Sequence, residues 1–185
     1  MHAPVKADVT LSQFVMIDVQ SRLASVMPTD ALQTAVKNCA ILLQTANMLD
    51  VPIMLTEQYP QGLGHTVPEL SALIPEVHPI EKMVFSCAAE PKFNRQLTRD
   101  RSQIIVAGME AHICILQTAL DLVAAGKQVF VVEDAVISRN PANKTNAVAR
   151  MREAGCIITN AESVAFEWLG AAGGDAFKAV SKLIR

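Results

Sequence analysis

The chain has 185 residues, of which 51% are hydrophobic and 18% are charged, and its formal net charge is −2. This size and composition predict one compact domain over residues 1–185 with a generous apolar core. No block of lysines or arginines stands out, so the electrostatic footprint of a nucleic-acid-binding protein is missing. The longest apolar runs fall well short of the ~20 residues that span a bilayer. We therefore expect neither nucleic-acid partners nor membrane insertion.

The cysteine pattern favours a reducing compartment. The chain has four cysteines and no C-x-x-C pair, at Cys39, Cys87, Cys114 and Cys156. The N-terminus shows neither a signal-peptide pattern nor an Arg-rich amphipathic leader. We expect reduced thiols and a cytoplasmic protein, with an organelle such as the mitochondrion, reached by an unconventional signal, left open.

Apolar runs and helical patterns alternate along the chain, which contains only 4% aromatic residues. Strands are predicted at 14–17, 51–56, 79–82, 104–107, 128–134 and 156–159. Helices are predicted from Thr29 as N-cap, and then at 91–101, 113–126, 140–155, 161–169 and 175–184, with a loop at 57–65. This alternation predicts an α/β fold, a three-layer α/β/α sandwich around a parallel sheet.

The stretch from Gln103 to Gly126 joins an apolar strand to an apolar helix through a bend at Gly108. Cys114 lies in the first turn of that predicted helix, where free backbone N–H groups and the positive end of the dipole favour a thiolate. Its position indicates either a reactive cysteine or a small buried apolar residue, because free cysteine is among the most buried residue types.

Asp18 and Lys82 also stand at the ends of predicted strands. Because open α/β sheets bind their ligands at the carboxyl ends of the strands, we expect both residues to lie near Cys114. A carboxylate can take the thiol proton, and a nearby ammonium stabilises the resulting anions. Amides at a helix start can bind an oxyanion. Taken singly, Asp18 can equally be a strand-end cap and Lys82 an exposed turn residue.

Several motifs carry a resemblance to a known family. FVMIDVQ at 14–20, EKMVFSC at 81–87 and VAGMEAHICILQTALDL at 106–122 resemble, in that order, the Asp, Lys and Cys motifs of the isochorismatase-like cysteine hydrolase superfamily. TEQYPQGLGHTVPEL at 56–70 is similar to its branch of isochorismatase domain-containing proteins. The C-terminal ITNAESVAFEWL and FKAVSKLIR, at 158–169 and 177–185, are similar to the same branch.

The resemblance implies a six-stranded parallel sheet in a Rossmann-like order and a homo-oligomer. It also implies hydrolysis of a C–N bond in a small amide- or ureido-type substrate through a thioester-type intermediate. Asp18 would be the general base, Lys82 the electrostatic partner and Cys114 the nucleophile. A cis peptide would join Met109 to Glu110, and the amides of Glu110 and Cys114 would form the oxyanion hole.

The chain also departs from its relatives. Those that hydrolyse nicotinamide carry metal-binding Asp-x-His and a further His after the second strand, where this chain has Glu57, Gln58 and Tyr59. We therefore expect no metal and no cofactor. His112 either tunes the neighbouring Cys114 or points elsewhere. The candidate pocket residues are Gln20, Glu57, Gln58, Tyr59, Phe85 and His112.

Two further expectations concern partners. An alternative function is a non-catalytic binding or scaffold protein that retains the fold and the triad. Phe166, Trp168 and Leu169 stand close together on a predicted helix, and they suggest an apolar patch through which copies of the chain associate.

Overall fold

The computed structural model describes residues 5–185 and contains a six-stranded parallel sheet. Its strand order is β3-β2-β1-β4-β5-β6. The strands are β1 (Ser12–Ile17), β2 (Ile53–Gln58), β3 (Ile80–Lys82), β4 (Gln103–Met109), β5 (Gln128–Ile137) and β6 (Ile157–Thr159). The chain crosses from one half of the sheet to the other between β3 and β4, as the expected Rossmann-like order requires.

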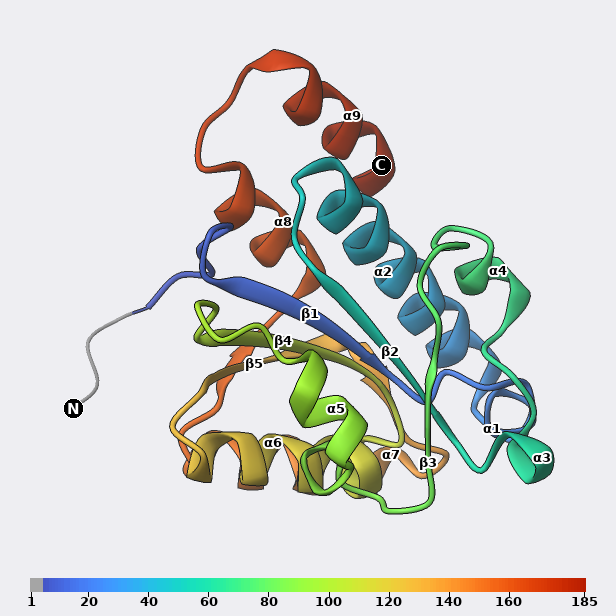
Figure 1. The fold of residues 1–185 in the computed structure, drawn as a ribbon. Coiled ribbons are helices and arrows are strands. Elements are labelled where there is room, and N and C mark those ends of the chain that lie inside the picture. The colour runs from blue at the N-terminus through green and yellow to red at the C-terminus, as the bar shows by residue number, and fades with distance from the viewer. Residues whose placement is uncertain (1–4) are drawn as a thin grey trace.

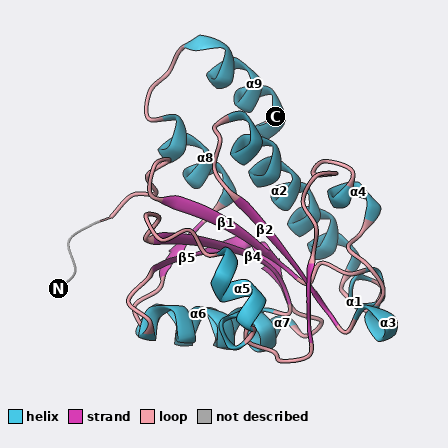
Figure 2. Cartoon of the chain, viewed as in Figure 1, coloured by secondary structure: helices cyan, strands magenta, loops and turns pink. Residues whose placement is uncertain are grey.

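Helices cover both faces of the sheet, which confirms the predicted three layers (Figures 1 and 2). One apolar core lies between the sheet and α2 (Thr29–Met48) and α8 (Ala161–Leu169). The other lies between the opposite face and α5 (Pro91–Gln96), α6 (Leu116–Ala124) and α7 (Pro141–Glu153). The remaining helices are α1 (Ser21–Ala24), α3 (Pro60–Leu63), α4 (Pro68–Ser71) and α9 (Gly174–Ile184). Within residues 5–185, no helix has both the length and the apolar character needed to cross a membrane.

The two central strands, β1 and β4, are buried along their whole length, because helices cover both faces of the sheet. At their carboxyl ends Gly108 pairs with Ile17, and its φ of 126° lies where glycine is favoured. A Cβ at this position would collide with the backbone of Ile17. Gly108 therefore allows β1 and β4 to approach closely beside Asp18.

Several predicted boundaries are wrong. Thr29 is the first residue of α2 rather than its cap, because Pro28 occupies the cap position and supplies no side-chain hydrogen bond. Helix α5 ends at Gln96 instead of continuing to Arg101, since Leu97 is extended and the Thr98 amide donates to Gln13 Oε1 at 3.0 Å. Strand β5 continues to residue 137, and the predicted loop at 57–65 contains the end of β2 and the short helix α3.

The apolar patch predicted on α8 is buried in part, since Phe166 is still 38% exposed and Leu169 is half-buried. Trp168 is 3% exposed, and its Nε1 donates to Ser12 Oγ at 2.9 Å. Phe166 packs edge-on against Phe177, with ring centroids 6.2 Å apart. The prediction is wrong for Trp168, because helical spacing shows that apolar residues share a region without showing that another element covers them.

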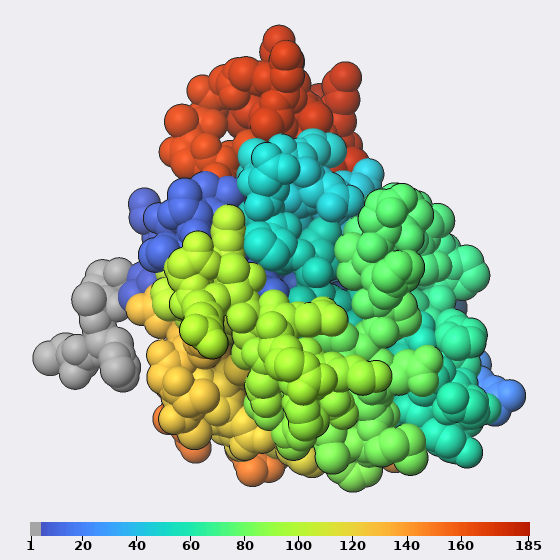
Figure 3. All heavy atoms as spheres, in the orientation of Figure 1, coloured from blue at the N-terminus to red at the C-terminus, as the bar shows by residue number. Residues whose placement is uncertain are grey.

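Exposed apolar side chains gather instead beside β3. The apolar ridge, as we call it, consists of Tyr59, Met83, Val84 and Phe85, which are 47%, 69%, 40% and 53% exposed. The amide of Tyr59 donates to the carbonyl of Lys82 at 3.0 Å, which joins the two parts of the ridge. Figure 3 shows the chain following β3, in green, on the front surface of the molecule.

Candidate active site

The carboxyl ends of three strands bring Asp18, Lys82 and Cys114 to one edge of the sheet. Asp18 follows β1 directly, Lys82 is the last residue of β3, and Cys114 lies in the turn after β4. Asp18 adopts a left-handed backbone conformation with φ of 53°. Its amide donates to the carbonyl of Thr56 at 3.1 Å, so the turn out of β1 is tied to β2.

Asp18 and Lys82 form a buried ion pair. The Lys82 Nζ lies 2.7 Å from Asp18 Oδ2, and both side chains are completely buried. Burial opposes the charged form of Lys82, but the attraction of the Asp18 carboxylate and the hydrogen bond to it outweigh burial and raise the pKa of Lys82. The lysine is therefore an ammonium at neutral pH.

Thr56 fixes the second carboxylate oxygen of Asp18. Its Oγ1 donates to Asp18 Oδ1 at 2.7 Å, so both oxygens of the carboxylate have a donor. Cys87, a second buried thiol, lies with its Sγ 3.8 Å from the same hydroxyl. The sequence predicts neither the Thr56–Asp18 nor the Thr56–Cys87 contact, because a threonine inside an apolar strand carries no spacing signal.

Cys114 lies in a π-helical turn, η2 (Ala111–Ile115), which precedes α6. The residue is 5% exposed. Burial, and then the charge of the Asp18 carboxylate and a hydrogen bond to it, raise the pKa of the Cys114 thiol, although Lys82 acts in the opposite direction. This direction opposes the thiolate that the helix-start position favours, because the buried thiol sits beside a carboxylate that can accept its proton.

The turn between β4 and Cys114 begins with a cis peptide bond between Met109 and Glu110. The Glu110 carboxylate points away toward the chain after β5, where its Oε2 accepts from the Arg139 amide at 3.0 Å. The carbonyl of Glu110 accepts from the amides of Ile113 and Ile115 at 3.1 and 3.3 Å. Backbone and side chain of Glu110 are therefore both fixed.

Two of the candidate pocket residues join the cluster. Gln58 Oε1 accepts from Lys82 Nζ at 2.7 Å. Gln20 holds the backbone of Gln58 from both sides: its Oε1 accepts from the Gln58 amide at 2.7 Å, and its Nε2 donates to the Gln58 carbonyl at 2.9 Å. The sequence placed both near the pocket without indicating these contacts.

The other candidate pocket residues point elsewhere. Glu57 is buried against Thr66, whose amide and hydroxyl donate to its Oε1 at 2.7 and 2.8 Å, and its Oε2 lies 3.0 Å from His65 Nδ1. The Nδ1 of His112 lies 2.9 Å from Ser138 Oγ, which favours the alternative that His112 does not face the thiol. Tyr59 and Phe85 belong to the exposed ridge.

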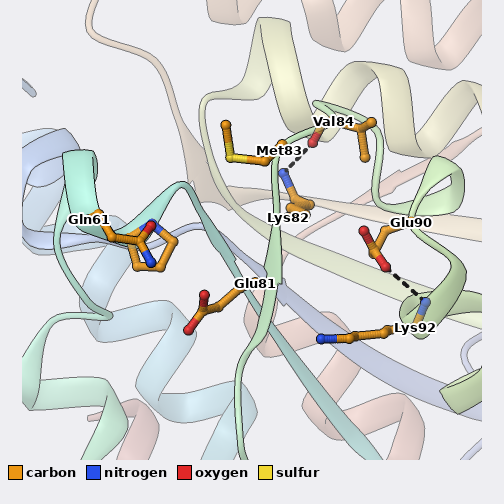
Figure 4. A pocket seen from close by; sticks show the side chains of 8 residues that line it. Gln61, Glu81, Lys82, Met83, Val84, Glu90 and Lys92 are labelled. Atoms are coloured by element: carbon orange, nitrogen blue, oxygen red, sulfur yellow. Dashed lines mark hydrogen bonds between the residues drawn. The ribbon is translucent and has the colours of Figure 1, made fainter.

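A surface hollow of about 390 Å³ lies along the outer edge of β3. Figure 4 shows Lys82, Met83 and Val84 on its wall, with the Lys82 ammonium bonded to the Val84 carbonyl. The other lining residues are Pro60, Gln61, Glu81, Glu90 and Lys92. The hollow thus shares Lys82 with the cluster, whereas Asp18 and Cys114 are not among its lining residues. Among residues 5–185, no three His, Cys, Asp or Glu side chains gather as metal ligands.

Comparison with known proteins identifies the family. The isochorismatase domain matches residues 12–163, so the chain belongs to the isochorismatase family. Mouse isochorismatase domain-containing protein 2A is 43% identical over 149 residues, which cover 79% of this chain and 70% of the mouse protein. This relative supports the branch indicated by the sequence motifs.

Two solved structures share nearly the whole fold. The MAR1 ribonuclease of Caenorhabditis elegans is 36% identical, with a TM-score of 0.90 over 97% of this chain and 92% of the other. The YcaC gene product of Escherichia coli, an octameric hydrolase of unknown specificity, is 25% identical, with a TM-score of 0.90 over 100% of this chain and 91% of the other. Their similarity agrees with the observed six-stranded parallel sheet.

Proposed function

We propose that this protein is a cysteine hydrolase that cleaves the C–N bond of a small amide- or ureido-type substrate. Cys114 is the nucleophile, Asp18 the general base and Lys82 the electrostatic partner. The observation that carries the proposal is the buried pair of Lys82 Nζ and Asp18 Oδ2, 2.7 Å apart, beside a thiol that interacts with the same carboxylate.

The first half of the proposed reaction forms a thioester. Asp18 takes the proton of the Cys114 thiol as the sulfur attacks the substrate carbonyl carbon, so the thiolate exists only as the C–S bond forms. The tetrahedral intermediate then collapses, the C–N bond breaks, and the leaving nitrogen takes the proton from Asp18. Lys82 remains an ammonium throughout and stabilises the negative charge that moves between Asp18 and the sulfur.

The second half releases the acid. Asp18 removes a proton from a water molecule, whose oxygen attacks the thioester carbon, and the C–S bond breaks as the Cys114 sulfur takes the proton back. Two backbone amides are the candidates for binding the oxyanion in both halves, those of Glu110 and Cys114. The fixed backbone at Glu110 supports this assignment, because a preorganised donor needs no rearrangement during the reaction.

A small substrate suits the site better than a polymer. Cys114 is only 5% exposed, which favours a compact molecule that can reach a buried sulfur. Although the C. elegans relative is named a ribonuclease, the formal net charge of this chain is −2, and RNA binding relies on basic surface. All four cysteines are free, which suits the reducing cytoplasm in which we place the reaction.

Self-association is part of the proposal. The octameric assembly of the E. coli relative supports it. The apolar ridge supplies a surface that the isolated chain leaves in water, with Met83 69% exposed. Such a patch is a candidate for the contact between copies.

The test is an ammonia-release assay on a panel of primary amides and ureides, with the unmodified chain and Cys114→Ala compared at equal concentration. We expect release with at least one compound and its loss in Cys114→Ala. Ammonia release that survives this substitution would refute the assigned nucleophile. No release from any compound, with the unmodified chain folded, would instead favour the binding or scaffold function.

A further inference from the structure

Gln58 is the last residue of β2 and is 7% exposed. Its side-chain Nε2 donates to the carbonyl of Met83 at 2.8 Å, which leaves Oε1 to accept from Lys82 Nζ at 2.7 Å. Because a carbonyl oxygen can only accept, the Met83 contact determines which end of the amide faces the ammonium. The orientation of Gln58 therefore follows from its partners.

The backbone of Gln58 is held as firmly as its side chain. Gln20, itself completely buried, bonds both the amide and the carbonyl of Gln58, and its Nε2 also donates to the carbonyl of Gly64 at 2.6 Å. The chain leaving β1 thus clamps the end of β2. This clamp transmits a fixed position through Gln58 to the Lys82 ammonium.

The ammonium of Lys82 has more acceptors than protons. Besides Asp18 and Gln58, the carbonyls of Phe85 and Val84 accept from Nζ at 3.1 and 3.3 Å. An ammonium has three N–H donors. With four oxygens around it, Lys82 has no proton to spare for a substrate, so it acts through its charge and its position.

We propose that Gln58 is a positioning residue of the hydrolase: its Oε1 holds the Lys82 ammonium against Asp18 without adding a negative charge. This inference rests on the proposed function. An uncharged acceptor fixes the ammonium and leaves its charge available to Asp18 and the sulfur. A carboxylate in the same place would compete for that charge.

Two substitutions separate position from charge. Gln58→Glu keeps an acceptor of the same size and adds a negative charge, whereas Gln58→Met keeps the approximate size and removes both hydrogen bonds. Gln33→Met is the matched control, because Gln33 is an exposed glutamine on α2, away from the cluster and the hollow. The readouts are the second-order rate of iodoacetamide alkylation at Cys114 at pH 8, resolved by mass spectrometry, and ammonia release from the best amide.

We expect Gln58→Glu to slow alkylation about tenfold, because an added negative charge that raises the thiol pKa by one unit lowers the thiolate fraction tenfold. Gln58→Met should slow alkylation less than Gln58→Glu does, because Lys82 keeps Asp18 and two carbonyls as acceptors, while its kcat falls about tenfold or more, and Gln33→Met should change neither. Alkylation depends on no substrate. If the unmodified chain hydrolyses nothing, the proposed function fails, yet alkylation still decides the role of Gln58.

Equal alkylation rates in the unmodified chain and Gln58→Glu would overturn the proposal. So would equal slowing in both Gln58 variants together with a fall in the thermal midpoint, since that result indicates a merely structural residue. Should Gln58→Glu fail to fold, Gln58→Met decides: a reduced kcat with alkylation slowed by less than about tenfold supports positioning, and any other combination contradicts it.

Discussion

Lys82 Nζ lies 2.7 Å from Asp18 Oδ2, and neither side chain has any exposed surface. Two charges taken out of water are tolerated because they attract one another and because hydrogen bonds satisfy their remaining atoms. Removing one partner leaves the other uncompensated in a medium that solvates it poorly. The same pair therefore affects both the stability of the fold and the proposed chemistry.

Replacing Lys82 with methionine should lower the free energy of unfolding by about 3 to 5 kcal/mol, because the Asp18 carboxylate then remains buried without its counter-charge. Urea unfolding followed by circular dichroism measures the loss. Lys92→Met is the control, since Lys92 is an exposed lysine on the wall of the neighbouring hollow. Equal losses in the two variants would show that the buried pair contributes nothing specific.

Asp18→Asn should fold but lose turnover. The Lys82 ammonium keeps Gln58 and two backbone carbonyls as acceptors, so we expect a smaller loss of stability than in Lys82→Met. Hydrolysis should fall by about 10²- to 10⁴-fold, because the amide cannot take the thiol proton. Iodoacetamide should still modify Cys114. Turnover close to that of the unmodified chain would remove Asp18 from the role of base.

Alkylation of Cys114 should become faster at every step from pH 6.5 to 9.5. Burial and the Asp18 carboxylate raise the pKa of this thiol above its ordinary value. The neutral thiol therefore dominates at neutral pH, and the thiolate fraction grows about tenfold per pH unit while the pH stays below the pKa. Site-resolved mass spectrometry gives the rate at each pH. A plateau reached below pH 8 would indicate a preformed thiolate.

The unmodified chain should form an oligomer in solution, with a mass of at least twice the monomer mass of 20.0 kDa. If the apolar ridge is the contact, Phe85→Ser should shift the population toward the monomer in light scattering at micromolar concentration. Val26→Ser is the matched control, because Val26 is 56% exposed at a different site. A monomeric unmodified chain would contradict the proposed self-association, and an unchanged mass in Phe85→Ser would exclude the ridge as the main contact.

The sequence predicts the fold and the meeting of the three candidate catalytic residues, but not the hydrogen bonds that hold these residues. Parallel strands place their carboxyl ends together, so the predicted strands before Asp18, Lys82 and Cys114 indicate that these residues lie at one edge, and the family resemblance adds their roles. The hydrogen bonds that hold these three residues in place are harder to predict from sequence. Thr56 on β2 bonds Asp18 after β1, and Gln58 on β2 bonds Lys82 on β3. Neither contact follows from spacing within one element.

The burial of individual side chains also could not be predicted from local sequence patterns. The thiolate expected at Cys114 follows from its place near a helix start, whereas the raised pKa follows from the surroundings that the whole fold creates. Trp168 illustrates the same limit: its spacing on α8 suggests an exposed patch, but the bond to Ser12 comes from a strand 156 residues earlier.

The most direct test of the central claim is to trap the covalent intermediate. The unmodified chain and Asp18→Asn are mixed with the amide that releases most ammonia, quenched in acid within one turnover and analysed by peptide mass spectrometry. We predict an acyl group on Cys114 in the unmodified chain and none in Asp18→Asn. Turnover without any adduct on Cys114, or an adduct on Cys87 instead, would contradict the account.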